Sequence, residues 1–276
     1  ASPLGGEAGW VPPTVARGIG LTVPARVVPE FAITAAAGEP EFLSIACDPV
    51  RAAESIRHHS ARDAERWPAF VERLRKLSGF LEAMYQLPAP DIDTKSEQQI
   101  RKEARELKKK LAGEGIVAEM VAPRLWFSPM TIDGAYTSND KKCRQYAIDR
   151  SLRCIDIAKI LGTDLIVLWL AREGTYLRES KSGKRSTELL VEALDKMLAH
   201  DKKARLAIEP KPNEPMDHAY IPTIGHALAV AQLARDPKRV GALIERAHCI
   251  LAGLAPADEM DFAMTFGKLW SLHLND

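Results

Sequence analysis

The sequence predicts an α/β fold in which parallel strands alternate with helices in a barrel. From residue 115 onward, short apolar runs with the length of strands alternate with longer segments of helical periodicity. Carboxylate or imidazole side chains stand at the end of three of these apolar runs. Parallel strands end at one edge of a sheet, so we expect these side chains at the end of the barrel where such folds hold their chemistry.

Five strands and four helices are expected in this part of the chain. The strands are residues 116–121, 164–169, 205–209, 240–245 and 269–274, and the helices are residues 140–161, 186–200, 222–234 and 257–267. The first helix is well marked, because Asn139 or Asp140 can cap its start and Gly162 can end it. A complete eight-stranded barrel takes about 250 residues. Five strands therefore predict an incomplete barrel.

Composition excludes several classes of protein. Lys and Arg number 38 against 37 Asp and Glu, so a net charge of +1 predicts no attraction to nucleic acid or membrane. The four cysteines are scattered without a C-x-x-C pair, which predicts reduced thiols in a cytoplasm: Cys47, Cys143, Cys154 and Cys249. The sequence contains no apolar run of about 18 residues and does not start like a signal peptide. A cytoplasmic protein is expected.

The octapeptide at residues 208–215, Ile-Glu-Pro-Lys-Pro-Asn-Glu-Pro, is the main candidate for a catalytic segment. If the strand continues to Lys211, Glu209 and Lys211 point to the same side, because side chains alternate along a strand. This spacing predicts a metal ligand beside a lysine that moves a proton or stabilises charge. The alternatives are an exposed carboxylate at a strand end and a surface lysine.

Two further strands end in side chains that can bind a metal. Glu245 and His248 are three residues apart and face one cavity if the chain turns after Glu245, while His273 ends the last strand. Histidine with few carboxylates suits Mn²⁺, Co²⁺ or Zn²⁺ better than Mg²⁺. We expect Glu209, Glu245 and His273 to converge. The alternative for His273 is a histidine of the core.

These segments resemble a known family. Residues 119–276 resemble the xylose isomerase-like TIM barrels, which are metal-dependent aldose–ketose isomerases. Three matching segments occur in order: Asp-Gly-Ala-Tyr-Thr-Ser-Asn-Asp at 133–140, Leu-Trp at 168–169 with Arg-Glu-Gly at 172–174, and the octapeptide at 208–215. The resemblance implies a (β/α)8 TIM barrel, here incomplete, and a sugar as the substrate.

The resemblance also implies a role for each candidate. Glu209 would bind metal and take part in catalysis, and Lys211 would polarise the sugar oxygen during a 1,2-hydride shift. Glu245 would bridge two divalent ions, Mn²⁺, Co²⁺ or Mg²⁺, and His248 would bind the second. The alternative with the same fold is a sugar 3-epimerase, in which two glutamates abstract and return a proton.

The chain also departs from that family. His273 stands where strict xylose isomerases carry aspartate, so the sugar is not fixed as xylose, and Arg246 stands where a small residue is expected. The ring-opening histidine of the family has no counterpart, and the sequence ends after what resembles the seventh strand. A catalytically inactive, truncated or chimeric binding module is therefore a further alternative. For a full-length protein, the resemblance implies a homo-oligomer.

Trp126 and Trp169 are candidates for the walls of the sugar site. The C–H faces of a sugar pack on aromatic rings, and the reaction requires water to be excluded. The alternative is that both are tryptophans of the core.

Residues 1–95 do not fit the isomerase family. Residues 5–93 resemble an internal segment of phytoene desaturase-like flavin oxidoreductases in four places: residues 6–13, 48–56, 60–68 and a helix at 69–85. No G-x-G-x-x-G turn is present, so flavin binding is not implied. We expect two domains, residues 1–95 and 96–276. The first is either foreign to the barrel or a divergent N-terminal region.

Overall fold

The computed structural model describes residues 17–20, 30–34, 42–85 and 91–274, and the chain divides into two compact units, Ala1–Pro90 and Asp91–Asp276. In the first unit, β1 (Glu30–Thr34) pairs antiparallel with β2 (Phe42–Ala46), followed by α2 (Pro49–Arg57) and α3 (Ala61–Tyr85). Its small core joins the two helices to β2: Ala53, Ile56, Ala64, Leu43, Ile45 and Trp67. The expected helix at 69–85 is part of α3, whereas residues 6–13 lie outside the described residues.

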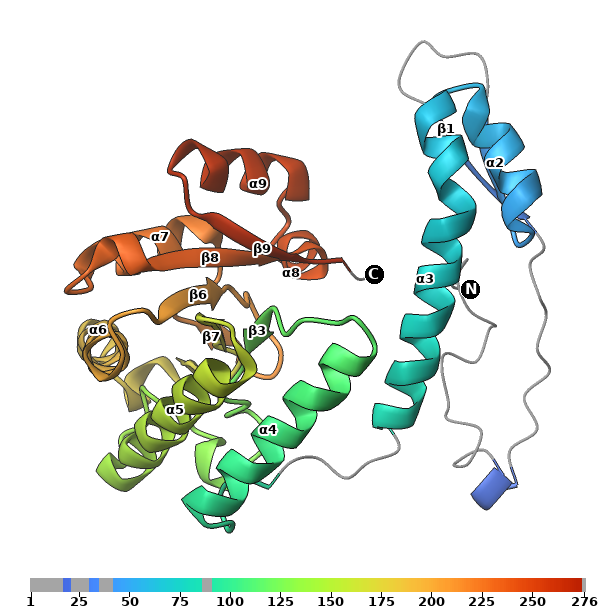
Figure 1. The fold of residues 1–276 in the computed structure, drawn as a ribbon. Helices are drawn as coiled ribbons and strands as arrows, with labels where there is room; N and C mark the ends of the chain where they lie inside the picture. Colours follow the sequence, from blue (N-terminus) through green and yellow to red (C-terminus); the bar gives the residue numbers. More distant parts are fainter. Residues whose placement is uncertain (1–16, 21–29, 35–41, 86–90, 275–276) are drawn as a thin grey trace. The chain divides into compact units, whose positions relative to one another are not determined.

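The second unit contains a five-stranded parallel sheet that forms part of a barrel (Figure 1). The strand order is β3 (Met120–Val121), β4 (Leu165–Trp169), β6 (Arg205–Glu209), β8 (Val240–Glu245) and β9 (Leu269–His273). The prediction of an incomplete parallel barrel is confirmed. Most expected bounds differ from the observed ones by three residues or fewer, but the first strand begins at Met120 and not at residue 116. The Ile116 N–H donates to Leu111 O, because Gly115 has a φ of 68° and the chain is still closing the preceding helix there.

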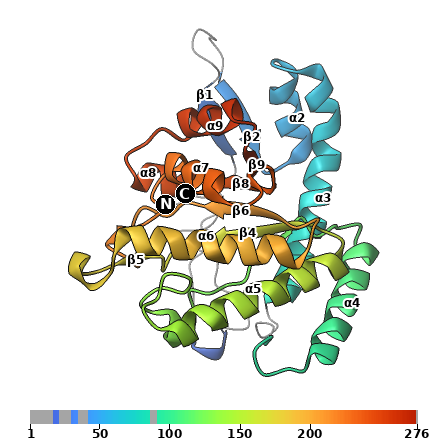
Figure 2. The same ribbon diagram turned by 90° about the vertical axis from the view of Figure 1, so that its left-hand side faces the viewer.

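Helices cover one face of this sheet (Figures 1 and 2). They are α4 (Glu97–Gly113), α5 (Lys141–Leu161), α6 (Gly183–His200), α7 (Ile224–Leu233) and α9 (Pro256–Thr265), and each contacts the next. Asp140 caps α5 by accepting from the Lys142 N–H at 2.8 Å, and Gly162 ends it at a φ of 97°. None of the helices in the described parts of the chain has the length and apolarity that a membrane span requires.

The two faces of the sheet differ because side chains alternate along each strand. Ile166, Leu168, Leu206 and Ile208 pack against the helices in the main core. Leu165, Val167, Ala207 and Leu243 pack together on the opposite face, with Met120 and Trp270. On that opposite face, at the carboxyl ends of the strands, Trp169 is paired with Glu209 and Glu245 with His273. The alternation thus places the candidate ligands on the inner face, at one end of the sheet.

A short antiparallel ribbon, absent from the sequence predictions, ties two of the loops at this end together. β5 (Gly174–Thr175), in the loop after β4, pairs with β7 (His218–Ala219), in the loop after β6. A side chain at position 174 would place its Cβ 2.5 Å from His218 O, so only glycine allows the two backbones to approach. The ribbon holds the loop that carries Lys211.

Candidate metal centre

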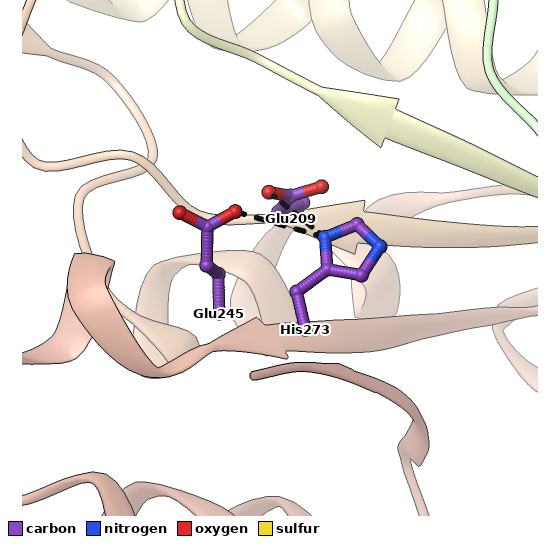
Figure 3. A group of neighbouring side chains, drawn as sticks. All are labelled: Glu209, Glu245 and His273. Carbon is purple, nitrogen blue, oxygen red and sulfur yellow. Dashed lines mark ion pairs between the residues drawn. The ribbon is translucent and has the colours of Figure 1, made fainter. Parts of the chain in front are cut away.

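Three side chains from three adjacent strands meet at the carboxyl end of the sheet (Figure 3). Glu209, Glu245 and His273 each offer one ligand atom, and these atoms lie within 4.8 Å of one another. His273 Nδ1 is 3.6 Å from both Glu209 Oε1 and Glu245 Oε2. Two carboxylates and an imidazole at these distances are a donor set that Mn²⁺, Co²⁺ or Zn²⁺ accepts.

The electrostatics of Glu209 suit a bound cation. Only 3% of this residue is exposed. Burial, a hydrogen bond with Glu245 and the charge of Glu245 raise the pKa of Glu209 to about 9, and the nearby charge of Lys211 offsets these effects only in part. Two carboxylates this close disfavour each other's charged form, whereas a divalent cation between them favours it. The Glu209–Glu245 pair therefore has the properties of a metal ligand pair.

His248 lies beside this group and not within it. Its Nε2 is 2.8 Å from Glu245 Oε1, whereas its Nδ1 is 3.7 Å from Glu209 Oε1, which is too far for a hydrogen bond. The short helix α8 (Arg246–Leu251) begins directly after β8 and turns the His248 ring back toward Glu245, while Arg246 is exposed. The role of His248 as a metal ligand remains a prediction, and in this structure it orients Glu245.

Lys211 is buried, with 8% of the residue exposed, two residues beyond the end of β6. Its backbone N–H donates to Ile221 O at 3.0 Å, and the β5–β7 ribbon closes the same loop. The loop is therefore fixed at both ends, and the ammonium lies close enough to Glu209 to lower that carboxyl's pKa. A buried cation held beside a carboxylate pair can donate to an oxygen of a bound ligand.

A second buried carboxylate, Glu173, supports these loops, and sequence reasoning assigned it no role. It accepts from the backbone N–H groups of Ala135, Tyr136 and Thr137 at 3.1, 2.9 and 2.9 Å, and from Thr137 Oγ1 at 2.6 Å. Its own backbone O accepts from the Tyr220 N–H at 2.9 Å. Glu173 thus joins the loops after β3, β4 and β6. The segments at 133–140 and 172–174 contain these residues, but neither segment indicates its partner.

Trp126 and Trp169 lie together near the carboxylates. Their rings make an edge-to-face contact with centroids 5.5 Å apart, and Trp169 stacks on His248 at 6.3 Å. Both line a cavity of about 220 Å³. Trp126 is 38% exposed, so it is not a tryptophan of the core. Their role as walls of a sugar site remains a prediction.

Unpartnered polar atoms gather at the same end of the sheet. Within the described ranges, six buried side-chain atoms have no hydrogen-bond partner, and five of them follow or end β4, β6 or β8: Trp169 Nε1, Arg172 Nε, Asn213 Oδ1, Tyr220 OH and His248 Nδ1. Buried polar groups are normally satisfied, so such a cluster indicates a place for a ligand. Together with the Glu209 carboxyl, these atoms fit a site that holds a metal ion and a polar substrate.

Comparison with known proteins agrees with the fold. The family model of the xylose isomerase-like TIM barrel matches residues 80–276. The chain belongs to this family. The match begins earlier than the resemblance at 119–276 indicated. No comparison supports the resemblance of residues 5–93 to flavin oxidoreductases. A xylose isomerase is among the relatives of this chain, and sugar epimerases are among the solved structures that share its fold.

Three relatives illustrate the family. A xylose isomerase of Thermus thermophilus is 36% identical over 176 residues, which make up 62% of this chain and 46% of that protein. The 3-keto-D-glucoside 4-epimerase of E. coli is similar in structure with a TM-score of 0.51, at 15% identity over 66% of this chain and 67% of that one. An L-ribulose 3-epimerase gives a TM-score of 0.50, at 16% identity over 69% of this chain and 57% of that one. The chain thus spans about half the length of the xylose isomerase relative.

Proposed function

We propose that the protein is a metal-dependent aldose–ketose isomerase that acts by a 1,2-hydride shift. The observation that carries this proposal is the convergence of Glu209, Glu245 and His273, with ligand atoms within 4.8 Å of one another, beside the buried Lys211. The 36% identical xylose isomerase supports the same reaction class. Because His273 supplies an imidazole to the group, the proposal covers aldoses in general and not xylose alone.

Glu209, Glu245 and His273 would hold a divalent ion, Mn²⁺ or Co²⁺ by the chemistry of these donors. When bound, such an ion acts as a Lewis acid on adjacent sugar oxygens. The side chains prepare this site in two ways. His248 holds Glu245 through the 2.8 Å contact, and Trp169 stacks on His248, so the Glu245 carboxylate has a fixed orientation.

The reaction moves one hydride and one proton. The hydride passes from C2 to C1 of the open-chain aldose, the O2 hydroxyl loses its proton, and O1 gains one as the carbonyl moves to C2. Lys211 donates to the carbonyl oxygen on which negative charge develops, and its buried position makes this donation stronger than it would be in water. The two tryptophans would shield the open-chain sugar from water.

The test is turnover in deuterated water with Mn²⁺ or Co²⁺. The chain is incubated with a panel of aldopentoses and 6-deoxyaldohexoses, and the ketose is analysed by NMR and mass spectrometry. A hydride shift predicts a ketose that carries little deuterium on carbon. The absence of any ketose, or full carbon-bound deuterium in the product, would reject the proposal.

The second candidate is sugar 3-epimerisation, which one observation favours. The raised pKa of Glu209 next to Glu245 describes a carboxyl pair that can share one proton, as a reaction that abstracts and returns a proton requires. In deuterated water an epimerase would incorporate deuterium at C3 of a ketose, and the product would be another ketose. The same NMR spectra therefore separate the two reactions. Sugar binding without either product would indicate an inactive binding module.

A further inference from the structure

Arg124, at the carboxyl end of β3, has an unusual environment. It lies three residues after this strand with a φ of 47°, a left-handed conformation that is unfavourable for a residue other than glycine. It is exposed, and no carboxylate in the described parts of the chain forms a salt bridge with it. Residues in such conformations persist where the surrounding structure holds them, and they occur often at ligand sites.

Aromatic rings hold the Arg124 side chain in place. Its guanidinium carbon lies 5.4 Å from the ring centroids of both Trp126 and Phe127. Phe127 is fixed in turn by Arg150, whose guanidinium lies 5.2 Å from the ring, and Arg150 is anchored by Asp93 at 2.5 Å. Stacking uses the flat faces of a guanidinium and leaves its N–H groups free in the plane, where they can bind a carboxylate or phosphate with two parallel hydrogen bonds.

Arg124 lines a cavity whose Trp169 wall also contacts His248, beside the candidate metal centre. The cavity of about 220 Å³ is bounded by Arg124, Trp126 and Trp169. Trp169 stacks on His248, and His248 contacts Glu245. Arginine and the tryptophan indole can donate hydrogen bonds but cannot accept them, and Trp169 Nε1 is buried without a partner. A ligand that satisfies both groups must present acceptor oxygens.

We propose that Arg124 binds an oxyanion carried by the sugar, so that the preferred substrate is an acidic or phosphorylated sugar whose charged group lies away from the metal-binding carboxylates. This inference rests on the proposed function, since it takes Glu209, Glu245 and His273 as the reacting end of the site. Carboxylate and phosphate share the chemistry that a stacked guanidinium recognises. Trp126 and Trp169 then bind the apolar faces of the sugar between the two charged ends.

The experiment compares three sugars that differ only at C6: D-glucose, D-glucuronate and D-glucose 6-phosphate. Each is titrated into the whole chain, with a chelator and with Mn²⁺, and binding is followed by tryptophan fluorescence and by calorimetry. At least one acidic sugar should bind about tenfold or more tightly than glucose, the scale of a hydrogen-bonded charge. The preference should weaken with added salt. The two acidic probes show whether the site takes a carboxylate or a phosphate.

Three variants test the residue. Arg124→Met keeps the apolar stem and should abolish the preference, while Arg124→Lys keeps the charge without the planar fork and should retain only part of it. Arg185→Met is the matched control, because Arg185 is an exposed arginine of α6 that pairs with Glu188. It should bind like the unmodified chain. Circular dichroism and the melting temperature show whether each variant is folded. If Arg124→Met does not fold, the comparison uses Arg124→Lys.

Equal affinity for the three sugars, no binding of any, or an unchanged preference in the folded Arg124 variants would overturn the inference. The titrations with chelator do not depend on turnover. An acidic sugar that binds through Arg124 without being isomerised would therefore sustain the inference and reject the proposed reaction. Isomerisation of neutral sugars that Arg124→Met leaves unchanged would reject the inference and sustain the proposed reaction.

Discussion

The two ends of the parallel sheet differ in how their charged side chains are paired. At the amino end, Arg239 donates to Leu198 O, Asp201 O and Ala204 O and pairs with Asp236 at 2.8 Å. At the carboxyl end, Glu209 and Glu245 lie together with His273 (Figure 3). Charges that find a partner within the fold contribute to stability, whereas carboxylates placed against each other cost stability and mark a site for a ligand.

A single strand shows both patterns. β6 begins with Arg205, which pairs with Asp164 at 2.8 Å, and ends with the buried Glu209. Both side chains belong to the same face of the strand, because they are four residues apart. One strand of five residues thus carries an ion pair at its amino end and a candidate metal ligand at its carboxyl end. Substitutions near the amino end should lower stability, and substitutions near the carboxyl end should lower turnover or metal binding.

The largest expected effect is on turnover at the carboxyl end. Lys211→Ala should lower kcat by about 10²-fold, the scale of losing one donor to developing charge. Stability should change little, since among the described residues the Lys211 side chain forms no salt bridge and acts on the fold through its charge near Glu209. Steady-state kinetics and thermal melts measure both quantities. Lys184→Ala, at an exposed lysine of α6, is the control. Equal losses of activity in the two variants would remove Lys211 from the mechanism.

Substitutions at the carboxyl end, and not those elsewhere, should change the effect of metal on the melting temperature. Mn²⁺ or Co²⁺ at about 100-fold above its Kd should raise the melting temperature by roughly 5–10 °C, because the ion binds only the folded state. Glu209→Gln should abolish this shift. Glu188→Gln, at an exposed glutamate of α6, should preserve it. Calorimetry with metal and with a chelator decides the question, and identical melting points in both solutions would count against the metal centre.

At the amino end the expected loss is stability without loss of metal response. Arg239→Met leaves three backbone carbonyls and Asp236 without their donor, so the free energy of unfolding should fall by about 2 kcal/mol. Urea titrations measure this change. The Mn²⁺-dependent rise in melting temperature should persist in the variant. Loss of that rise together with stability would show that the two ends are not independent.

The order of these elements could be read from the sequence, because it depends on local patterns. The apolar runs at 164–169, 205–209 and 240–245 and the caps of α5 are each recognised within a few consecutive residues, and strand alternation then puts Glu209 and Glu245 on one face. His273 pairs with Glu245 at the end of the neighbouring strand, after a register shift at Ala242–Leu243 that alternation alone does not include. These expectations required only that the strands be parallel and adjacent.

The contacts that hold the loops of the site in place could not be predicted from local patterns, because most of their partners are distant in sequence. Glu173 binds backbone groups 36 to 38 residues earlier, and the β5–β7 ribbon joins loops that follow different strands. The contact between His248 and Glu245 is local by contrast, and the sequence made it conditional on a turn after Glu245, where α8 begins without a side-chain cap. The environment of Arg124 likewise depends on Arg150 and Asp93, which lie on other segments.

The pH dependence of the metal-free protein should sharpen the comparison between the two ends. At the amino end, the backbone N–H of Lys203 and the side chain of Lys159 lower the pKa of Asp201, and Arg239 lowers that of Asp236. Their stabilisation is present above the unfolded pKa of 3.8 and is lost as pH falls below it.

At the carboxyl end, the folded protein holds the Glu209 proton to about pH 9, whereas the unfolded chain releases it near 4.5. Stability should therefore fall between these values as pH rises, by at most about 1.4 kcal/mol per pH unit for one proton.

Urea titrations with a chelator from pH 5 to 9 would measure that slope. Glu209→Gln cannot lose the proton and should flatten the slope over this range, while Arg239→Met should lower stability by a similar amount at every pH in it, because Asp236 is ionised throughout in both states. A steep slope that survives in Glu209→Gln would place the titrating group elsewhere. A slope that vanishes only in that variant would assign the titrating proton to Glu209, at the carboxyl end of the sheet beside Glu245.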